Sequence, residues 1–228
     1  CALPISAEDF SSMLNSEQGP ETCNTYNMLR LTKMLYATTS NASYMDFYEQ
    51  ALYNHILSTI NPVQGGFVYF TPMRAGHYRV YSQPQTSFWC CVGSGLENHA
   101  RYGEMIYAHK DNNLFVNLFI PSTIKWNGAT IEQKNNFPYE DFTTLTVTPG
   151  KESKFNIKVR KPEWTSSPKV EVNGQIVNAT IKDGYINIER KWKEGDVIKV
   201  TLPMSLKKVS TPDGANHYSF MYGPIVLA

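Results

Sequence analysis

The sequence predicts an α+β chain of two domains, with a helical domain over residues 1–109 and an antiparallel β-sandwich over residues 110–228. Three observations lead to this prediction. Apolar residues in the first half recur every three or four positions, which is typical of amphipathic helices. In the second half apolar and polar residues alternate within short segments, which is typical of strands. Tight turns rather than helices separate those segments, so the strands are expected to pair antiparallel.

Helical spacing in the first half predicts helices over residues 20–38, 44–60 and 96–109. In the first of these, Met28, Leu31 and Leu35 follow the helical period. Pro20 stands in its first turn, where the missing N–H would have had no hydrogen-bond partner. Between the second and third helices, the sequence FVYFT predicts a short strand, and a loop containing several prolines follows it.

The second half carries three residue pairs that favour two-residue hairpin turns, because Asn-Gly and Asp-Gly readily adopt positive φ angles. These pairs are Asn127-Gly128, Asn173-Gly174 and Asp183-Gly184. Alternating segments surround them, among them TIKW, ATIEQ, TTLTVT, FNIKVR, VEV, YINIER and DVIKVT. Strands at such regular spacing favour a β-sandwich.

Composition narrows the classes of partner. The chain has 228 residues, 42% of them hydrophobic, which is enough to build a sizeable core. Lysine and arginine total 21 against 20 acidic residues, so no excess of positive charge is available to bind nucleic acid. No apolar run approaches the roughly 18 to 20 residues that a membrane helix needs. We therefore expect neither nucleic acid nor membrane as a partner, and the oligomeric state stays open.

The cysteines suggest a metal site. The chain has four, Cys1, Cys23, Cys90 and Cys91, and the adjacent pair can hardly form a disulfide with itself without strain. Zn2+ prefers thiolate, imidazole and carboxylate ligands in a tetrahedral arrangement. Glu21 and Cys23, together with the Cys90–Cys91 pair, supply four such donors. This spacing predicts a zinc site.

Local geometry sets a condition on this site. Residues two apart point to different sides of a helix, so Glu21 and Cys23 can share a metal only at an irregular helix start, which Pro20 favours. Gly93 and Gly95 follow the cysteine pair and let the chain bend there. Two alternatives stay open from the residues alone: buried structural cysteines without metal, and a closed structural zinc clamp.

Several strings together resemble a known family. They are GPETCNTYNMLRLTKMLY, FYEQALYNHIL, GGFVYFTPM, SFWCCVGSGLENHARYGEMIY, NLFIPSTIKW, KVRKPEW and YGPIVLA. The chain resembles the β-L-arabinofuranosidases of glycoside hydrolase families 127 and 146 from about Asp9 to its end. The ETC and WCC motifs in this order are the most specific part of the resemblance.

The resemblance implies that the helical segment is the C-terminal part of an (α/α)6-barrel catalytic domain and that β-sandwich domains follow it. It also implies that Glu21, Cys23, Cys90 and Cys91 bind zinc, with Cys90 as the nucleophile of a retaining mechanism. In the same way Glu49 and Tyr69 are similar to family residues that bind the arabinofuranose hydroxyls.

One departure from the family concerns the general acid/base. The family has a glutamate upstream of the ETC motif, and the aligned position here is Ala2 in the string CALPI. Retaining hydrolysis needs a group that protonates the leaving oxygen and later activates water. Glu8 and Glu17 are the nearest glutamates along the chain that could substitute for it, and neither aligns with the family position. The chain is therefore expected to be a fragment that can be inactive alone.

We expect a glycoside hydrolase, or a fragment of one, that releases β-linked L-arabinofuranose from plant-type glycans. The rival hypothesis is a non-catalytic carbohydrate-binding or structural module in which zinc is a clamp. A thiol redox protein that uses the Cys90–Cys91 pair ranks lowest because vicinal disulfides are strained. The resemblance favours a bacterial protein, periplasmic or secreted ahead of cytoplasmic.

Overall fold

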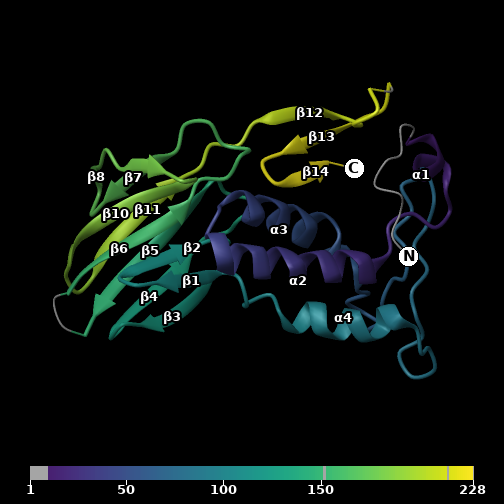
Figure 1. Cartoon of the computed structure of the whole chain (residues 1–228), viewed down its shortest axis with the longest axis horizontal. Helices are drawn as coiled ribbons and strands as arrows, with labels where there is room; N and C mark the ends of the chain where they lie inside the picture. Colours follow the sequence, from purple (N-terminus) through teal and green to yellow (C-terminus); the bar gives the residue numbers. More distant parts are fainter. Residues whose placement is uncertain (1–9, 151–152, 215, 228) are drawn as a thin grey trace. The chain divides into compact units, whose positions relative to one another are not determined.

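A computed structural model describes residues 10–150, 153–214 and 216–227 of the chain (Figure 1). The described residues divide into two compact units. One takes those within 1–38, 47–102 and 206–228, and the other those within 39–46 and 103–205. The predicted order, helices first and an antiparallel β-sandwich after them, is confirmed. Residues 206–228, included above in the sandwich domain, group with the helices instead.

All helices within the described residues lie before residue 101. They are α1 (Ser11–Asn15), α2 (Thr22–Thr39), α3 (Ser43–Asn54), the 3-10 helix η1 (Ile56–Thr59) and α4 (Cys90–Ala100). The predicted helix over residues 44–60 is therefore two elements, α3 and η1. None of the helices within the described ranges combines the length and the apolar character that crossing a membrane requires.

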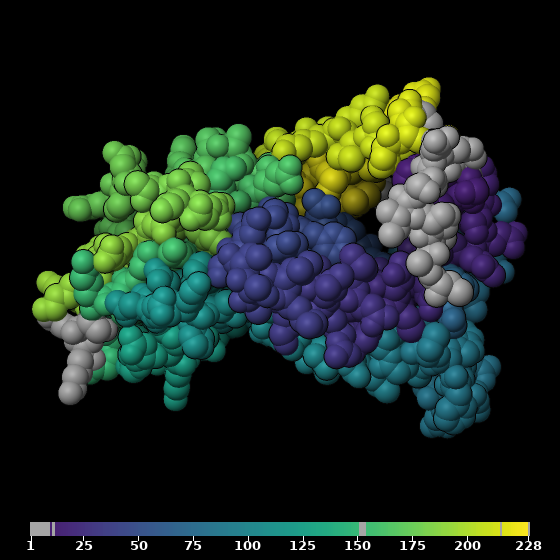
Figure 2. Space-filling view, in the orientation of Figure 1, coloured from purple at the N-terminus to yellow at the C-terminus, as the bar shows by residue number. Residues whose placement is uncertain are grey.

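Helix α2 has two apolar sides, and only one is covered. Its buried residues include Tyr26, Leu29 and Tyr36. Met28 and Leu31, which belong to the spacing that predicts the helix, are 40% and 47% exposed. The purple-to-blue surface of α2 is open to view in Figure 2. The apolar spacing thus predicts the helix correctly. The side of the helix that is buried, however, is the one that carries Tyr26 and Leu29, with threonines beside them.

Helix α4 corrects the prediction of a helix over residues 96–109. It begins at Cys90, six residues earlier than predicted, and ends at Ala100. Gly93 and Gly95 weaken the helical signal, because glycine is a poor helix former. Gly95 is needed there, since a Cβ atom at this position would stand 2.7 Å from the ring of Phe67. The chain after Ala100 turns and enters a strand at Tyr107.

The second unit is a β-sandwich. One sheet has the order β1-β2-β6-β10-β9, with bounds β1 (Tyr107–Lys110), β2 (Asn113–Val116), β6 (Ser153–Arg160), β9 (Thr180–Lys182) and β10 (Tyr185–Trp192). The other has the order β3-β4-β5-β11-β7-β8, with bounds β3 (Ser122–Trp126), β4 (Ala129–Lys134), β5 (Phe142–Pro149), β7 (Lys169–Val172), β8 (Gln175–Ile176) and β11 (Asp196–Thr201). Neighbouring strands pair antiparallel, apart from the parallel pair β2 and β6.

The sandwich core is apolar, and its turns are those that the sequence predicts. Alternate residues such as Phe155, Ile157 and Val159 on β6 are fully buried in it. Each predicted hairpin pair has positive φ angles at both residues, for example 53° at Asn173 and 77° at Gly174. These turns join β3 to β4, β7 to β8 and β9 to β10.

A buried ion pair stabilises the same unit. The side chain of Arg160 is fully buried, and its guanidinium donates a hydrogen bond to Asp46 at the start of α3. Its Nε also donates to the main-chain oxygen of Asn117 at 2.7 Å. The carboxylate of Asp46 in turn accepts the backbone N–H of Glu163 at 3.2 Å. The Asp46 carboxylate and the main-chain oxygen of Asn117 thus give the guanidinium the acceptors that a buried charge requires.

The C-terminal strands form a third, small sheet. It consists of β12 (Leu206–Ser210), β13 (Tyr218–Tyr222) and β14 (Ile225–Leu227), in that order. Asn54 at the end of α3 anchors it, because its side chain donates to the main-chain oxygen of Pro224 at 2.8 Å and accepts the N–H of Val226 at 2.9 Å.

Candidate metal centre

Glu21 and Cys23 lie at the irregular start of α2. Glu21 precedes the helix and pairs with Phe70 in an isolated antiparallel bridge, while Cys23 is the second helical residue. Gly19 makes this entry possible: its φ is +59°, and a Cβ atom there would stand 2.2 Å from the main-chain oxygen of Thr71. The condition predicted for a shared metal, a non-helical Glu21 beside a helical Cys23, is therefore met.

Tyr69 reaches the same place on the neighbouring segment. The predicted strand over residues 67–71 is a set of isolated bridges rather than a continuous strand. The N–H of Thr22 donates to the main-chain oxygen of Tyr69 at 2.9 Å, and the N–H of Thr71 donates to that of Pro20, also at 2.9 Å. These two bonds fix Tyr69 beside the entry of α2.

Cys90 and Cys91 occupy the first turn of α4. Trp89 before them is extended, with φ −82° and ψ 149°, so the helix starts sharply at Cys90. A bend at Gly93 and Gly95, suggested above, is not how the two side chains converge, since both glycines are helical. Glu21 Oε1 lies 3.8 Å from Cys90 Sγ and 3.8 Å from Cys91 Sγ.

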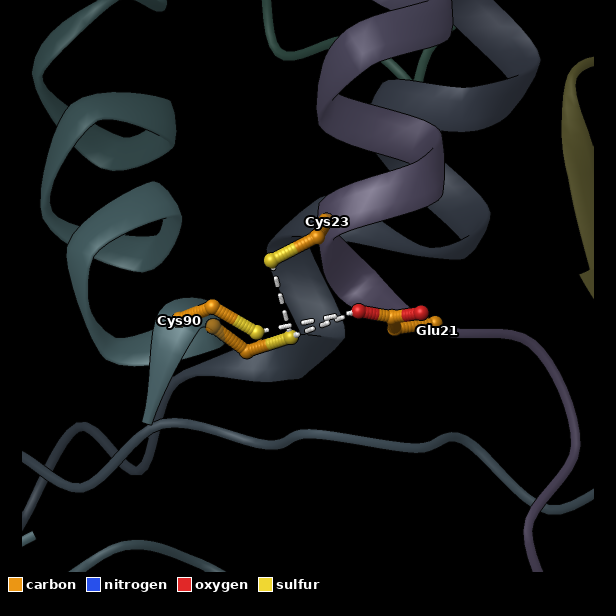
Figure 3. A group of neighbouring side chains, drawn as sticks. Glu21, Cys23 and Cys90 are labelled. Carbon is orange, nitrogen blue, oxygen red and sulfur yellow. Dashed lines mark hydrogen bonds between the residues drawn. The ribbon is translucent and has the colours of Figure 1, made fainter. Parts of the chain in front are cut away.

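The four predicted ligands form one cluster. Their donor atoms all lie within 4.8 Å of one another. Figure 3 shows Cys23 at the start of α2 and Cys90 at the start of α4 directed toward each other, with the carboxylate of Glu21 pointing toward the sulfurs from the segment that enters α2. Cys23 Sγ and Cys91 Sγ are 3.1 Å apart. No disulfide joins the three cysteines that the structure describes.

The donor set and its dimensions fit a zinc ion. Tetrahedral zinc with Zn–S bonds near 2.3 Å places its ligand atoms roughly 3.8 Å apart. The separations of 3.8 Å from Glu21 Oε1 to Cys90 Sγ and to Cys91 Sγ match this spacing, and the 3.1 Å between Cys23 Sγ and Cys91 Sγ is shorter than it. Three thiols and one carboxylate also match the soft and borderline donors that zinc takes.

The three sulfurs stand in different environments. Cys91 is fully buried and Cys23 is partly buried, whereas Cys90 is exposed. Burial raises the pKa of the thiols of Cys91 and Cys23. The hydroxyl of Tyr69, 3.3 Å from Cys90 Sγ, lowers the pKa of the Cys90 thiol. The exposed sulfur is therefore the one that most readily becomes a thiolate, and the thiolate is the nucleophilic form.

The two predicted sugar-binding residues lie in different surroundings. Tyr69 is in direct contact with the cluster through Cys90. Glu49 is fully buried on α3, so its carboxylate is not a solvated group on a helix surface. It is not one of the four clustered ligands.

Of the two glutamates considered as substitutes for the general acid/base, the structure describes only Glu17. Glu17 forms an ion pair with Arg74 at 3.3 Å, and both side chains are more than half exposed. Glu8 and Ala2 lie outside the described residues.

Sequence reasoning gives no site role to Ser94, which contacts the cluster, or to His55, which links two segments of the same unit. Ser94 Oγ lies 3.2 Å from Cys23 Sγ. His55 bridges two segments, with Nδ1 2.7 Å from Thr25 Oγ1 on α2 and Nε2 3.1 Å from Thr71 Oγ1. Ser94 follows Cys91 by three residues, so both lie on one side of α4. The sequence could indicate this only if the helix were known to start at Cys90.

Comparison with known proteins places this arrangement in a family. Residues 6–104 match the model of the β-L-arabinofuranosidase GH127 catalytic domain, and residues 113–204 match that of the GH127 middle domain. The chain belongs to the GH127 β-L-arabinofuranosidase family. The helical segment of this GH127 chain therefore corresponds to catalytic-domain sequence, and its β-sandwich to the middle domain.

Known relatives of this GH127 chain are considerably longer. It is 24% identical over 227 residues to the non-reducing end β-L-arabinofuranosidase of Bifidobacterium longum subsp. longum, covering 90% of this chain and 34% of the relative. A GH127 β-L-arabinofuranosidase structure from Geobacillus stearothermophilus T6 matches with a TM-score of 0.78 and 26% identity, over 92% of this chain and 37% of that one. Another GH127 β-arabinofuranosidase structure matches with a TM-score of 0.77 and 27% identity, over 93% and 38%. The chain thus spans little more than a third of their length.

Proposed function

We propose that this chain carries the metal centre and the nucleophile of a retaining glycoside hydrolase that releases β-linked L-arabinofuranose from arabinose-containing glycans. The observation that carries the proposal is the cluster of Glu21, Cys23, Cys90 and Cys91, whose donor atoms lie within 4.8 Å of one another. In this proposal the four residues hold zinc. When bound, the metal keeps its thiolate ligands deprotonated at neutral pH and fixes their positions.

Cys90 is the proposed nucleophile because it is the exposed sulfur of the cluster and has Tyr69 beside it. In the first step its sulfur attacks the anomeric carbon, so that a C–S bond forms while the glycosidic C–O bond breaks and the leaving alcohol takes up a proton. In the second step water attacks the same carbon, breaks the C–S bond and gives up a proton. Two displacements at one carbon retain its configuration.

Tyr69 and Glu49 are the proposed contacts to the sugar hydroxyls. The phenol of Tyr69 stays protonated, because its hydrogen bond to Cys90 raises its pKa. It can therefore donate to the Cys90 thiolate or to a hydroxyl of a bound sugar. A carboxylate such as Glu49 accepts hydrogen bonds from sugar hydroxyls. The proton donor for the leaving alcohol is not assigned, and Glu8 and Glu17 stay the glutamates nearest along the chain to the family position at Ala2.

The rival function, a non-catalytic module with zinc as a structural clamp, predicts a closed site with four protein ligands. The exposure of Cys90 argues for the catalytic alternative, because a structural ligand gains nothing from access to solvent. Cys91, by contrast, is fully buried, as expected of a ligand that only holds the metal.

A covalent label tests the proposal. An arabinofuranose-configured epoxide is incubated with the chain, and the modified residue is located by mass spectrometry of peptides. We expect one label, on Cys90, that free L-arabinose reduces by competition. Cys90→Ser should abolish the label, whereas Cys1→Ser should leave it unchanged. Labelling that persists in Cys90→Ser, or that L-arabinose does not affect, would refute the nucleophile or the sugar site respectively.

A further inference from the structure

Ser94 places a hydroxyl against one particular sulfur of the cluster. It lies on α4, and only 8% of its surface is exposed. Its Oγ is 3.2 Å from Cys23 Sγ and 3.4 Å from the main-chain oxygen of Cys91, and its single hydrogen can be donated to either. The hydroxyl therefore stands between the two helices that supply the sulfurs.

Packing on both sides fixes this position. One residue further along α4, Gly95 lets the helix rest directly on the ring of Phe67, where a Cβ atom would be 2.7 Å from the ring. In the next turn, Tyr26 of α2 donates its hydroxyl hydrogen to the carboxylate of Glu97 on α4. These contacts hold α4 against α2, so Ser94 has little freedom to move away from Cys23.

The hydrogen bond distinguishes Cys23 from the other two cysteines. Cys90 is exposed and has the hydroxyl of Tyr69 as its partner. Cys91 is fully buried, next to Cys23. As a thiolate, Cys23 has lone pairs in addition to the one that a metal would take, and the hydroxyl of Ser94 can donate to one of them. Such an outer hydrogen bond orients a metal ligand and stabilises its charged form.

We propose that Ser94 is a positioning residue that holds Cys23 as an anchoring thiolate of the metal centre. This inference rests on the zinc site of the proposed function. A nucleophilic Cys90 must be free to bond to the sugar, so the remaining ligands must retain the metal meanwhile. Ser94 supplies Cys23 with the orientation that this retention needs, and it does so without contact to the sugar.

The test compares matched variants of the 228-residue chain by two readouts. The first is the rate at which a chromophoric chelator withdraws zinc. The second is the sulfur-to-metal charge-transfer absorption of the chain loaded with Co2+ in place of zinc. For Ser94→Ala we expect zinc release at least about 10-fold faster, because loss of an outer partner typically weakens metal affinity by about 10- to 100-fold and a weaker complex dissociates faster. The absorption should move to longer wavelength, because a sulfur that loses a hydrogen bond gives up an electron more easily.

Three further variants serve as controls. Ser94→Thr keeps the hydroxyl and should resemble the original chain. Valine has nearly the same shape as threonine but lacks the hydroxyl, so Ser94→Val should resemble Ser94→Ala. Ser82→Ala removes another buried serine hydroxyl, which accepts the N–H of Phe67 at 2.9 Å. It should lower stability without shifting the Co2+ absorption.

The possible failures are distinguishable. The original chain can bind metal while Ser94→Ala and Ser94→Val release zinc at the same rate as the original chain and have the same Co2+ absorption. That result would refute the role of Ser94 and leave the metal centre standing. If the original chain binds neither zinc nor Co2+, the proposed metal centre itself is refuted.

Discussion

Tyr69 and Cys90 meet across two chain segments, with the phenolic oxygen 3.3 Å from the sulfur. The pairing between residues 20–22 and 69–71 determines this contact, because it fixes the backbone of Tyr69 beside the start of α2. The contact shifts the two groups in opposite directions, lowering the pKa of Cys90 and raising that of Tyr69. The phenol therefore holds its proton more tightly, and the thiol holds its proton less tightly, than either group would alone.

Tyr69→Phe should make Cys90 less reactive. The hydroxyl of Tyr69 is the largest cause of the lowered pKa of Cys90, so its removal raises that pKa and reduces the thiolate fraction at neutral pH. We expect the alkylation of Cys90 by iodoacetamide, followed on metal-free chain by peptide mass spectrometry, to need a higher pH in this variant. Tyr78→Phe, at an exposed tyrosine outside the cluster, should leave the profile unchanged. An unchanged profile in Tyr69→Phe would contradict the hydrogen bond.

The purified chain should contain one zinc ion, and chelation should expose three thiols. Elemental analysis and a thiol reagent, applied before and after chelation, measure these quantities. Glu21→Gln removes the only carboxylate of the cluster and should weaken zinc binding by more than the roughly 10-fold that loss of an outer partner costs. The matched control is Glu17→Gln, which changes an exposed glutamate paired with Arg74. Absence of metal from a folded chain would favour buried structural cysteines instead.

The sequence predicts the sandwich well because its signals are local. An Asn-Gly or Asp-Gly pair determines a hairpin turn by its own backbone preferences, and Asn173 and Gly174 adopt the expected positive φ angles. The position of two predicted ligands also follows from local sequence. Pro20 predicts a helix start, and Glu21 and Cys23 lie at that start. These features depend on neighbours in sequence.

What the sequence does not predict depends on contacts between distant segments. The two glycines of α4 argue against a helix at Cys90, and only the proximity of Phe67 explains why Gly95 is needed. Helix α2 has apolar residues on two sides, and periodicity alone does not say whether Leu29 or Leu31 is covered. For the same reason the contact of Ser94 with Cys23, 71 residues apart, has no sequence signal.

Asp46→Asn should strongly destabilise the β-sandwich unit. The substitution leaves the fully buried guanidinium of Arg160 without its carboxylate, and such a loss costs about 3–5 kcal/mol. Urea unfolding followed by the fluorescence of the sandwich tryptophans measures the change. Glu189→Gln, which breaks the exposed pair with Lys154, should cost less than about 1 kcal/mol. Similar effects for the two variants would contradict the buried pair.

His55 should make the stability of the helical unit depend on pH between about 4 and 6.5. Burial, with a smaller contribution from the Arg79 cation, lowers the pKa of His55 from 6.5 to about 4. The unfolded chain therefore binds more protons than the folded one in this window, so stability is retained above pH 6.5 and lost as the pH falls toward 4. At 1.36 kcal/mol per pKa unit the loss is on the order of 3 kcal/mol.

The variant His55→Gln isolates this effect, because glutamine is uncharged at every pH of the experiment. It should be less stable than the original chain at pH 7, where the hydrogen bonds from His55 to Thr25 and Thr71 are intact. Between pH 7 and pH 4.5 its thermal midpoint should fall less than that of the original chain. His217→Gln, at an exposed histidine of the same unit, should retain the original pH dependence. If His55→Gln and the original chain lose equal stability on acidification, His55 is not held neutral by its surroundings, and the protonation of other groups governs the acid sensitivity of this unit.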